Sequence, residues 1–212
     1  MRFTKLSHSC VRLEKDGAAL VIDPGMFGDA AADLADATAV LVTHEHPDHL
    51  DGDAIRAALD ADPALTLWAP RAVAEQFGDR ARQVGPGDAL QIAGFSVHAH
   101  GEQHAVIHPD IPVVANTGFL IDAELFHPGD AFTIPDEPVR TLLVPVSAPW
   151  LKAAEWIDYF REVAPSRGFA IHDDILNHNG LALVTRLMSV AGGQLTRLEP
   201  GTTVDLQAAR GR

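Results

Sequence analysis

Cysteine is almost absent from this chain of 212 residues, whose only thiol is Cys10. A single thiol cannot form a disulfide within the chain, so the fold must be stable without covalent cross-links. The sequence also lacks any run close to the roughly 18 consecutive apolar residues that a membrane-spanning helix needs. Its start, Met-Arg-Phe-Thr-Lys-Leu, has no apolar stretch of the kind found in signal peptides. These absences predict a soluble, cytoplasmic protein.

Positive charge is scarce as well, because 16 lysine and arginine residues are outnumbered by 29 aspartate and glutamate residues. The net charge of −13 makes the surface repel phosphate groups, which argues against nucleic acids and membranes as partners. Hydrophobic residues still make up 47% of the chain, which is enough for a buried core. We therefore expect a globular protein that acts on a small-molecule substrate. The composition leaves open whether the chain forms a homo-oligomer.

No polar linker, low-complexity tract or short-period repeat divides the chain, so we expect residues 1–212 to form one domain. Apolar runs typical of strands alternate with helical patterns in both halves, which predicts an α/β layered fold with sheets inside and helices outside. The expected strands span residues 10–13, 18–22, 39–42, 66–68, 95–99, 116–121, 124–126, 141–146, 169–171 and 195–198. The expected helices span residues 52–59, 70–77, 150–163 and 181–190.

Histidine is abundant, with 11 residues, and three of them lie in the run His44-Glu45-His46-Pro47-Asp48-His49. Imidazole nitrogens and carboxylate oxygens are ligands that suit Zn²⁺ and its first-row neighbours. In an extended turn His44 and His46 can share one cation, while Asp48 and His49 reach a second. A solvated polar loop is the alternative interpretation, but so dense a run of ligand residues favours a metal site.

Three more polar residues directly follow apolar strands: Asp23, Asp130 and His172. In α/β proteins the ends of strands are where binding sites form, so these side chains are expected near the histidine run. Taken singly, each has an ordinary structural explanation, since aspartate is common in turns and a lone histidine is more often structural than a ligand.

The order of these motifs resembles the metallo-β-lactamase superfamily. A His-x-His-x-Asp-His run follows a buried strand, an aspartate ends an earlier strand, and isolated histidine and aspartate residues follow. Residues 6–10 and 21–24 are also similar to the branch that contains ascorbate-phosphate lactonases and many uncharacterised zinc hydrolases. The resemblance covers nearly the whole chain and implies an αββα sandwich with metals at one edge of the paired sheets.

The resemblance also implies a role for each motif residue. The family's first-site ligands match His44, His46 and a later histidine, and its second-site ligands match Asp48, His49 and His172. Asp130 matches the carboxylate that bridges the two ions, and Asp23 matches the acid that supports the histidine run without binding metal itself. Two divalent ions are therefore expected, with Zn²⁺ first and Mn²⁺ or Fe²⁺ as alternatives.

The third ligand of the first site must be chosen from four histidines within residues 98–108. His98 and His100 lie on the polar face of an expected strand. His104 comes where that strand should give way to a loop, so we expect His104 to be the ligand, with His100 as second choice. His108 and His127 are each followed by proline, and we interpret them as loop residues.

Other residues have weaker indications. His8 lies near the mouth of the site in the family branch, where we expect it to support the ligands without binding metal, or it is simply hydrogen-bonded at a strand end. Cys10 is expected to be a small buried hydrophobe rather than a nucleophile. Trp150 could line the site, although an aromatic residue at a helix start is more often part of the core. We interpret Lys152 as a solvated helix start and leave the role of His178 open.

The resemblance implies a metal-dependent hydrolase that acts through a metal-activated hydroxide. Asp48 would both bind metal and aim the hydroxide at a small ester-like substrate, such as a lactone, a phosphodiester or a thioester. The alternative is a non-catalytic metal-binding or regulatory protein of the same fold. Ala131 stands where the family commonly has a threonine after Gly-Asp, so a role for that hydroxyl is absent.

Overall fold

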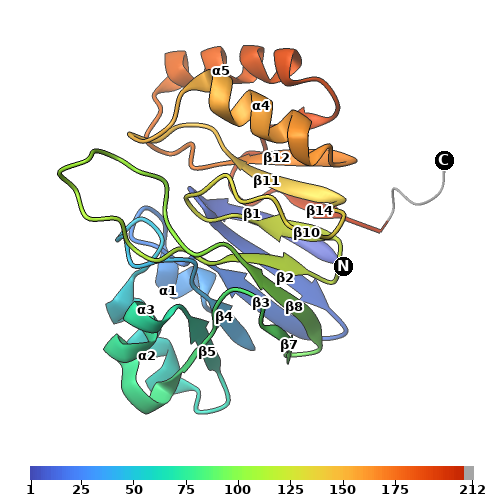
Figure 1. Ribbon diagram of the computed structural model, residues 1–212. Coiled ribbons are helices and arrows are strands. Elements are labelled where there is room, and N and C mark those ends of the chain that lie inside the picture. The colour runs from blue at the N-terminus through green and yellow to red at the C-terminus, as the bar shows by residue number, and fades with distance from the viewer. Residues whose placement is uncertain (208–212) are drawn as a thin grey trace.

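Two seven-stranded sheets lie between layers of helices (Figure 1). The computed structural model describes residues 1–207. The first sheet has the strand order β14 (Thr203–Asp205), β1 (Arg2–Ser7), β2 (Cys10–Lys15), β3 (Ala18–Ile22), β4 (Ala39–Leu41), β5 (Thr66–Ala69) and β6 (Ala81–Gln83). The second has the order β13 (Leu195–Thr196), β12 (Arg167–Ile171), β11 (Thr141–Pro145), β10 (Leu125–His127), β9 (Gly118–Ile121), β8 (Phe95–His100) and β7 (Ala89–Ile92).

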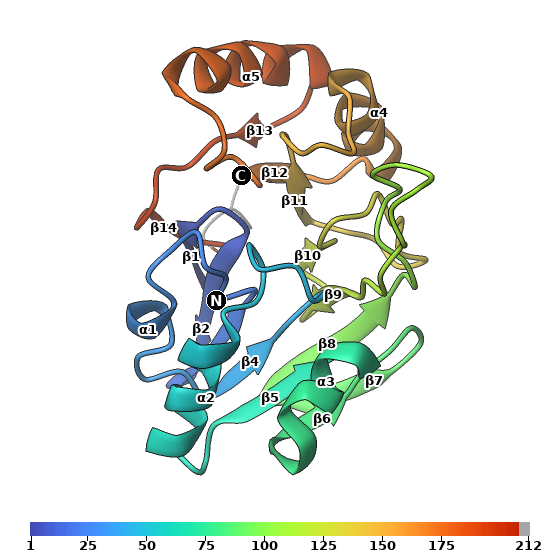
Figure 2. The same cartoon turned by 90° about the vertical axis from the view of Figure 1, so that its left-hand side faces the viewer.

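The helices form the outer layers. They are α1 (Ala30–Asp33), α2 (Gly52–Ala61), α3 (Arg71–Phe77), α4 (Ala153–Val163) and α5 (His178–Ala191). Figure 2 shows α4 and α5 at the top of the molecule, and α2 and α3 at the bottom. The longest helix within residues 1–207, α5, has 14 residues, and none of these helices is long and apolar enough to cross a membrane.

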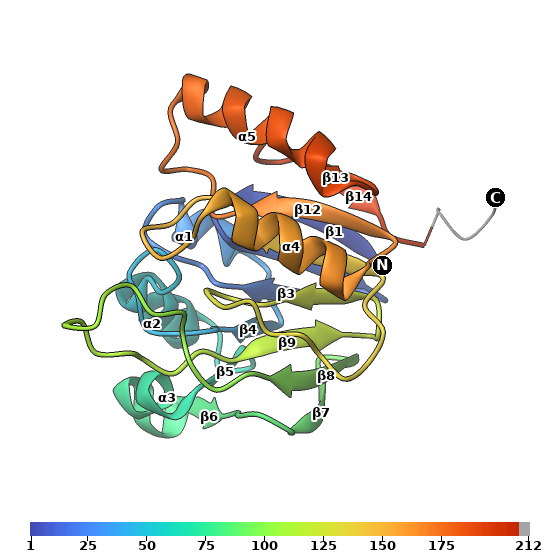
Figure 3. The same cartoon turned by 45° about the horizontal axis from the view of Figure 1, so that its top comes forward.

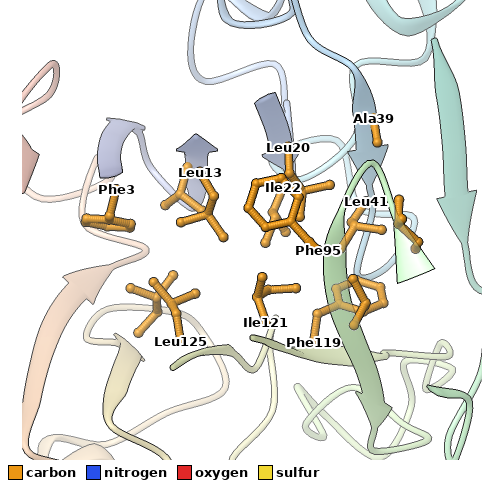
Figure 4. Packing of buried hydrophobic residues seen from close by; sticks show 14 of the residues in the cluster. Phe3, Leu13, Leu20, Ile22, Ala39, Leu41, Phe95, Phe119, Ile121 and Leu125 are labelled. Atoms are coloured by element: carbon orange, nitrogen blue, oxygen red, sulfur yellow. The ribbon is translucent and has the colours of Figure 1, made fainter. Parts of the chain in front are cut away.

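The main core lies between the two sheets, where alternating residues of each strand face inward. In β8 the side chains of Phe95, Val97 and Ala99 are buried against the first sheet, while the residues between them face away. Phe3 of β1 stacks on Phe169 of β12 with ring centroids 5.1 Å apart. Figure 4 shows buried side chains of the two sheets facing one another, with Phe3, Leu13 and Leu41 of the first sheet opposite Leu125, Ile121 and Phe119 of the second. Burying each such side chain stabilises the fold by roughly 1.5–3 kcal/mol.

Both sheets run from antiparallel to parallel pairing. The first is antiparallel from β1 to β3 and parallel from β3 to β6, and the second is antiparallel from β7 to β10 and parallel from β10 to β13. Parallel strands end at the same edge of a sheet, so the loops after them gather there. The long loop after β8 projects on the left of Figure 3, at this edge.

The expected layered architecture is confirmed, and the expected strands at residues 10–13 and 18–22 form the antiparallel hairpin β2–β3. Its turn residues Asp16 and Gly17 both have positive φ, as a tight hairpin turn requires. The strands that the sequence did not predict are β1, β6, β7 and β14. Three of these lie at or near sheet edges, and β1 carries the buried Lys5, which breaks its apolar alternation. Helix α4 starts at Ala153 rather than at residue 150.

Candidate metal centre

The candidate metal centre is built from the loops that follow β1, β3, β4, β8, β10 and β12. Asp23, directly after β3, is fully buried and joins two of these loops. Its carboxylate accepts hydrogen bonds from the amide and the hydroxyl of Thr43 and from Nδ1 of His49, each at 2.7 Å. Asp23 therefore holds the histidine run in place from behind, which is the supporting position that the family resemblance implied.

Four of the histidines are oriented in the same way, with Nδ1 donating to a protein oxygen. The donor–acceptor pairs are His44 to Thr43 Oγ1 at 2.9 Å, His49 to Asp23 Oδ2 at 2.7 Å, His104 to the carbonyl of Ala105, and His172 to the carbonyl of Ser147. Thr43 gives its own proton to Asp23, so its oxygen is free to accept. A neutral imidazole with its proton on Nδ1 carries a lone pair on Nε2. All four rings thus present Nε2 as a ligand atom.

These four Nε2 atoms are buried and make no hydrogen bond. Residues 1–207 contain eight buried side-chain nitrogen or oxygen atoms without a hydrogen-bond partner, and five of them belong here: the four Nε2 atoms and Oδ1 of Asp130. Leaving a buried polar group unpaired costs about 1–3 kcal/mol. Such a concentration of buried nitrogen and oxygen atoms without hydrogen-bond partners is explained if cations bind there.

Asp130 lies at the centre of the group. Its Oδ1 is 3.1 Å from Nε2 of His49, while its Oδ2 is 3.3 Å from Nε2 of His104 and 3.0 Å from Nε2 of His172. Ligand atoms within 4.8 Å of one another form three groups: His44, His46 and His104; His44, His49 and Asp130; and His8, Asp48, His49 and His172. The donor atoms therefore lie close enough to hold divalent cations, and the nitrogen and oxygen donors suit Zn²⁺.

His8 belongs to the last group by distance, but its hydrogen bonds assign it a different part. Its Nδ1 accepts from the amide of Asp174 at 3.4 Å, so its proton lies on Nε2. That Nε2 is 3.3 Å from Oδ2 of Asp48 and donates to it. His8 therefore holds the Asp48 carboxylate and has no lone pair to offer a metal, which matches its expected supporting position.

The choice between His104 and His100 is also decided by position. His104 lies among the unpaired atoms, with its ring 5.0 Å from that of His44 and 4.7 Å from that of His46. His100 and His98 lie on the outer face of β8, where both contact Glu137, at 3.1 and 2.7 Å. The structure therefore brings His104, and not His100, to the candidate metal centre.

The interpretation of His127 as a loop residue is wrong. It is the last residue of β10 and is completely buried. Its Nε2 donates to the carbonyl of Ser9 at 2.9 Å, and its Nδ1 accepts from the amide of Gly129 at 3.1 Å. Both ring nitrogens are occupied, so His127 joins the two sheets next to the metal centre but cannot be a ligand.

Asp130 is positioned by residues that the sequence did not single out. Asn116 accepts from the amide of Asp130 at 2.9 Å and donates to the carbonyl of Pro128 at 2.9 Å, which fixes the turn before it. A Cβ at Gly129 would lie 2.2 Å from Oδ1 of Asn116, so only glycine fits there. Trp150 donates from Nε1 to Oδ2 of Asp130 at 2.8 Å. Trp150 is therefore part of this site rather than of the core.

The backbone is strained at three of these positions. His8, Asp23 and His172 have φ values of 22°, 55° and 61°, a backbone region that residues other than glycine seldom adopt. Residues held in such conformations cluster at functional sites, where the surrounding structure enforces them at a cost of about 1–3 kcal/mol each. Here the three strained residues follow β1, β3 and β12, at strand ends that border the candidate metal centre.

Charge at the centre is strongly coupled. Burial lowers the pKa of His44 well below its ordinary value, which keeps this ligand neutral. Burial also acts to lower the pKa of His172, but Asp130 and Asp48 outweigh it and raise the pKa to about 9. Burial acts to raise the pKa of Asp130, yet the neighbouring imidazoles hold it well below its usual range. The carboxylates therefore require positive charge here, which protons or divalent cations can supply.

A buried ion pair behind the centre went unnoticed in the sequence. Lys5 of β1 is completely buried, and its Nζ donates to Asp173 Oδ1 at 2.5 Å and to the carbonyl of His8 at 2.9 Å. Asp173 follows His172 and also accepts from Nε of Arg197 at 2.6 Å. Lys5 therefore ties the end of β1 in one sheet to the end of β12 in the other.

The remaining expectations concern residues outside the centre. Cys10 is buried in β2, as predicted, and burial raises the pKa of its thiol well above the ordinary value. The side chain of Lys152 is 83% exposed and pairs with Glu155, which confirms it as a solvated helix start. His178 is exposed at the start of α5 and makes no contact with the candidate ligands among the described residues.

Comparisons with known proteins agree with this geometry. Residues 2–172 match the family described as the β-lactamase superfamily domain. Protein Rv0786c of Mycobacterium tuberculosis is 39% identical over 212 residues, which cover 98% of this chain and 95% of that protein. A metal-dependent hydrolase of Methanopyrus kandleri is 29% identical over 143 residues, covering 61% of this chain and 62% of that one.

The metallo-β-lactamase fold protein YhfI of Bacillus subtilis has the same fold, with a TM-score of 0.72 at 16% identity over 96% of this chain and 98% of that chain. This chain therefore belongs to the metallo-β-lactamase superfamily of metal-dependent hydrolases.

Proposed function

We propose that this protein binds two divalent ions, with Zn²⁺ as the first candidate, and hydrolyses a small ester-like substrate such as a lactone, a thioester or a phosphodiester. The observation that carries the proposal is the set of five buried, unpaired atoms around Asp130. When bound, the ions would supply Lewis acidity, which lowers the pKa of a water molecule toward neutrality and polarises the bond to be cleaved.

The two carboxylates of the centre would divide the work. The Asp130 side chain is 4% exposed and lies within 3.3 Å of His49, His104 and His172, so both of its oxygens could serve as ligands and it would be shared by the ions. The Asp48 side chain is 20% exposed and lies on the open side, where a water molecule can reach it. Asp48 would accept a hydrogen bond from the attacking water and orient it, while His8 donates from Nε2 to its Oδ2 at 3.3 Å.

The test combines metal analysis with an activity panel. Zinc-loaded protein is assayed on lactones, thioesters and phosphodiesters, after treatment with a chelator, and again after zinc is restored. We expect turnover of at least one class, loss of turnover on chelation, and recovery with zinc. Asp48→Asn should keep its fold by circular dichroism and lose at least about 10²-fold in kcat, the usual range for a group that moves a proton.

Two results would contradict the proposal. Full turnover in metal-free protein would exclude a role for the ions. Two bound ions with no turnover in any class would favour a non-catalytic metal-binding or regulatory protein of the same fold.

A further inference from the structure

Exposed apolar side chains gather on the loops that carry the candidate ligands. Nine large hydrophobic side chains are exposed within residues 1–207: Met26, Phe27, Val106, Ile111, Val113, Ile134, Ile175, Leu183 and Val190. All but the last two, which lie on α5, are in the loops that follow β3, β8, β10 and β12. Those loops also hold Asp23, His104, Asp130 and His172. Apolar side chains that gather at one exposed place mark a site for a ligand or a partner.

Ring contacts place two aromatic residues directly beside the metal centre. Phe27 is 51% exposed, and its ring lies 5.0 Å from the ring of His8, the residue that holds Asp48. On the other side, the ring of Trp150 lies 5.9 Å from that of His104 and donates to Asp130. The candidate metal centre thus lies between two aromatic walls.

The loop after β8 contributes to the same surface. The amide of His104 donates to the carbonyl of Val114 at 3.0 Å, so the two sides of the loop meet at the ligand. The amide of Ala105 donates to the carbonyl of Asp130 at 2.8 Å. The exposed residues Val106 and Val113 therefore lie at the base of the loop, close in sequence to these contacts with the candidate ligands. Figure 1 shows the loop projecting from this edge of the sheets.

The ion pairs at the centre, by contrast, involve no lysine or arginine among the described residues. Within residues 1–207 the only ion-pair partners of Asp48 and Asp130 are histidines. Lys5 is buried against Asp173, and Lys152 pairs with Glu155. Lys5 is thus out of reach of a ligand and Lys152 already faces a carboxylate, and the net charge of −13 disfavours an anionic substituent.

Ile175 lies near Phe27, because it follows Asp174, whose amide donates to Nδ1 of the same His8 that the ring of Phe27 contacts. We infer, resting on the proposed function, that the substrate is uncharged near the bond to be cleaved and carries an apolar acyl or aryl group that packs against Phe27 and Ile175. Among the three bond types, this favours a lactone or thioester with an apolar group over a phosphodiester. Phe27 and Ile175 would then determine specificity, because they offer apolar area and no charge.

The test uses metal-binding probes of graded length. Straight-chain hydroxamic acids from acetyl to octanoyl are titrated into zinc-loaded protein by calorimetry, because the hydroxamate binds the metal and the tail reports on the surroundings. We expect Kd to fall with each added methylene, by up to about fourfold. Succinic monohydroxamate, with a charged tail, should bind more weakly than the butyryl compound.

Variants then locate the apolar surface. Phe27→Ser and Ile175→Ser should flatten the dependence of Kd on chain length, whereas Leu183→Ser should keep the slope of the wild type. Leu183→Ser is the matched control, since Leu183 is equally exposed but lies on α5. A Kd independent of chain length, or tighter binding of the charged tail, would overturn the inference and leave the metal centre intact. If zinc itself does not bind, the proposed function fails first and this inference with it.

Discussion

The two sheets contribute to the candidate metal centre in different ways. The first sheet supplies four candidate ligands from one loop after β4: His44, His46, Asp48 and His49. The second supplies one residue from each of three separate loops: His104, Asp130 and His172. Residues in one run are placed by local backbone geometry, whereas single residues from distant loops are placed only when the two sheets pack correctly. Metal affinity therefore reports on the packing of the sheets.

The largest effect should come from removing the residue that joins the two groups of ligands. Asp130→Ala should lower bound zinc from two ions to fewer than one per chain and reduce turnover by at least about 10³-fold. His46→Ala removes a ligand from the first group only, so it should retain one ion. Elemental analysis of dialysed protein measures both. Equal metal content in the two variants would contradict a bridging position for Asp130.

The contact between the sheets can be weakened near the centre and far from it. Lys5→Met breaks the buried pair with Asp173, and Arg167→Met breaks the 2.8 Å pair with Glu124 at the other end of β12. Because each change leaves a buried carboxylate short of one partner, each should lower the free energy of unfolding by about 3–5 kcal/mol. Urea denaturation at pH 7 measures this loss.

Only one of the two variants should affect the metal. Lys5→Met loosens the ends of β1 and β12, where His8 and His172 lie, so it should weaken binding of the second zinc ion by about 10–100-fold. Arg167→Met should bind both ions as the wild type does. If both variants lost zinc to the same extent, Lys5 would have a general structural role and no special relation to the centre.

The same difference between the sheets explains how much of the site the sequence could predict. The run from His44 to His49 is visible because its ligands are adjacent in sequence. Asp130 and His172 were assigned through the family resemblance and the position of each after a strand. Asn116 and Lys5 could not be found in this way, because their partners lie 14 and 168 residues away. His127 was misread because proline after a strand end looks like a loop.

The fold shows a similar division. The buried parallel strands were predicted because continuous apolar runs identify them. The edge strands β6, β7 and β14 are short and partly exposed, so their sequences carry little alternation. Helix α4 begins later than predicted because Trp150 turns back to Asp130 before the helix starts, a contact that helical periodicity does not encode.

A smaller effect should follow from the indole hydrogen bond. Trp150→Phe keeps an aromatic ring beside His104 but removes the donor to Asp130, so zinc affinity should fall by about tenfold, at the lower end for residues that support metal ligands. Competition with a chromophoric chelator measures the change. The control is Trp156→Phe, on the buried face of α4, which should leave zinc affinity unchanged. Unchanged affinity in Trp150→Phe would show that the hydrogen bond does not influence the metal.

The smallest effect should come from Glu137, a carboxylate outside the centre that contacts two histidines. Hydrogen bonds and charge from His98 and His100 lower the pKa of Glu137. Because the folded pKa is lowered, the stabilisation is present above about pH 4.5 and is lost as the pH falls further. Glu137→Gln should therefore cost less than about 1 kcal/mol at pH 7 and less at pH 3 than at pH 7, with metal content unchanged. Urea midpoints at the two pH values test this, and a loss of zinc would contradict it.

The central claim is that residues from both sheets enclose two cations around Asp130. Diffraction data collected on crystals of zinc-loaded protein on both sides of the zinc absorption edge test it most directly. The account predicts two anomalous peaks, one next to His44, His46 and His104 and one next to Asp48, His49 and His172, with Asp130 touching both. A single peak away from Asp130, or no peak at this edge of the sheets, would contradict it.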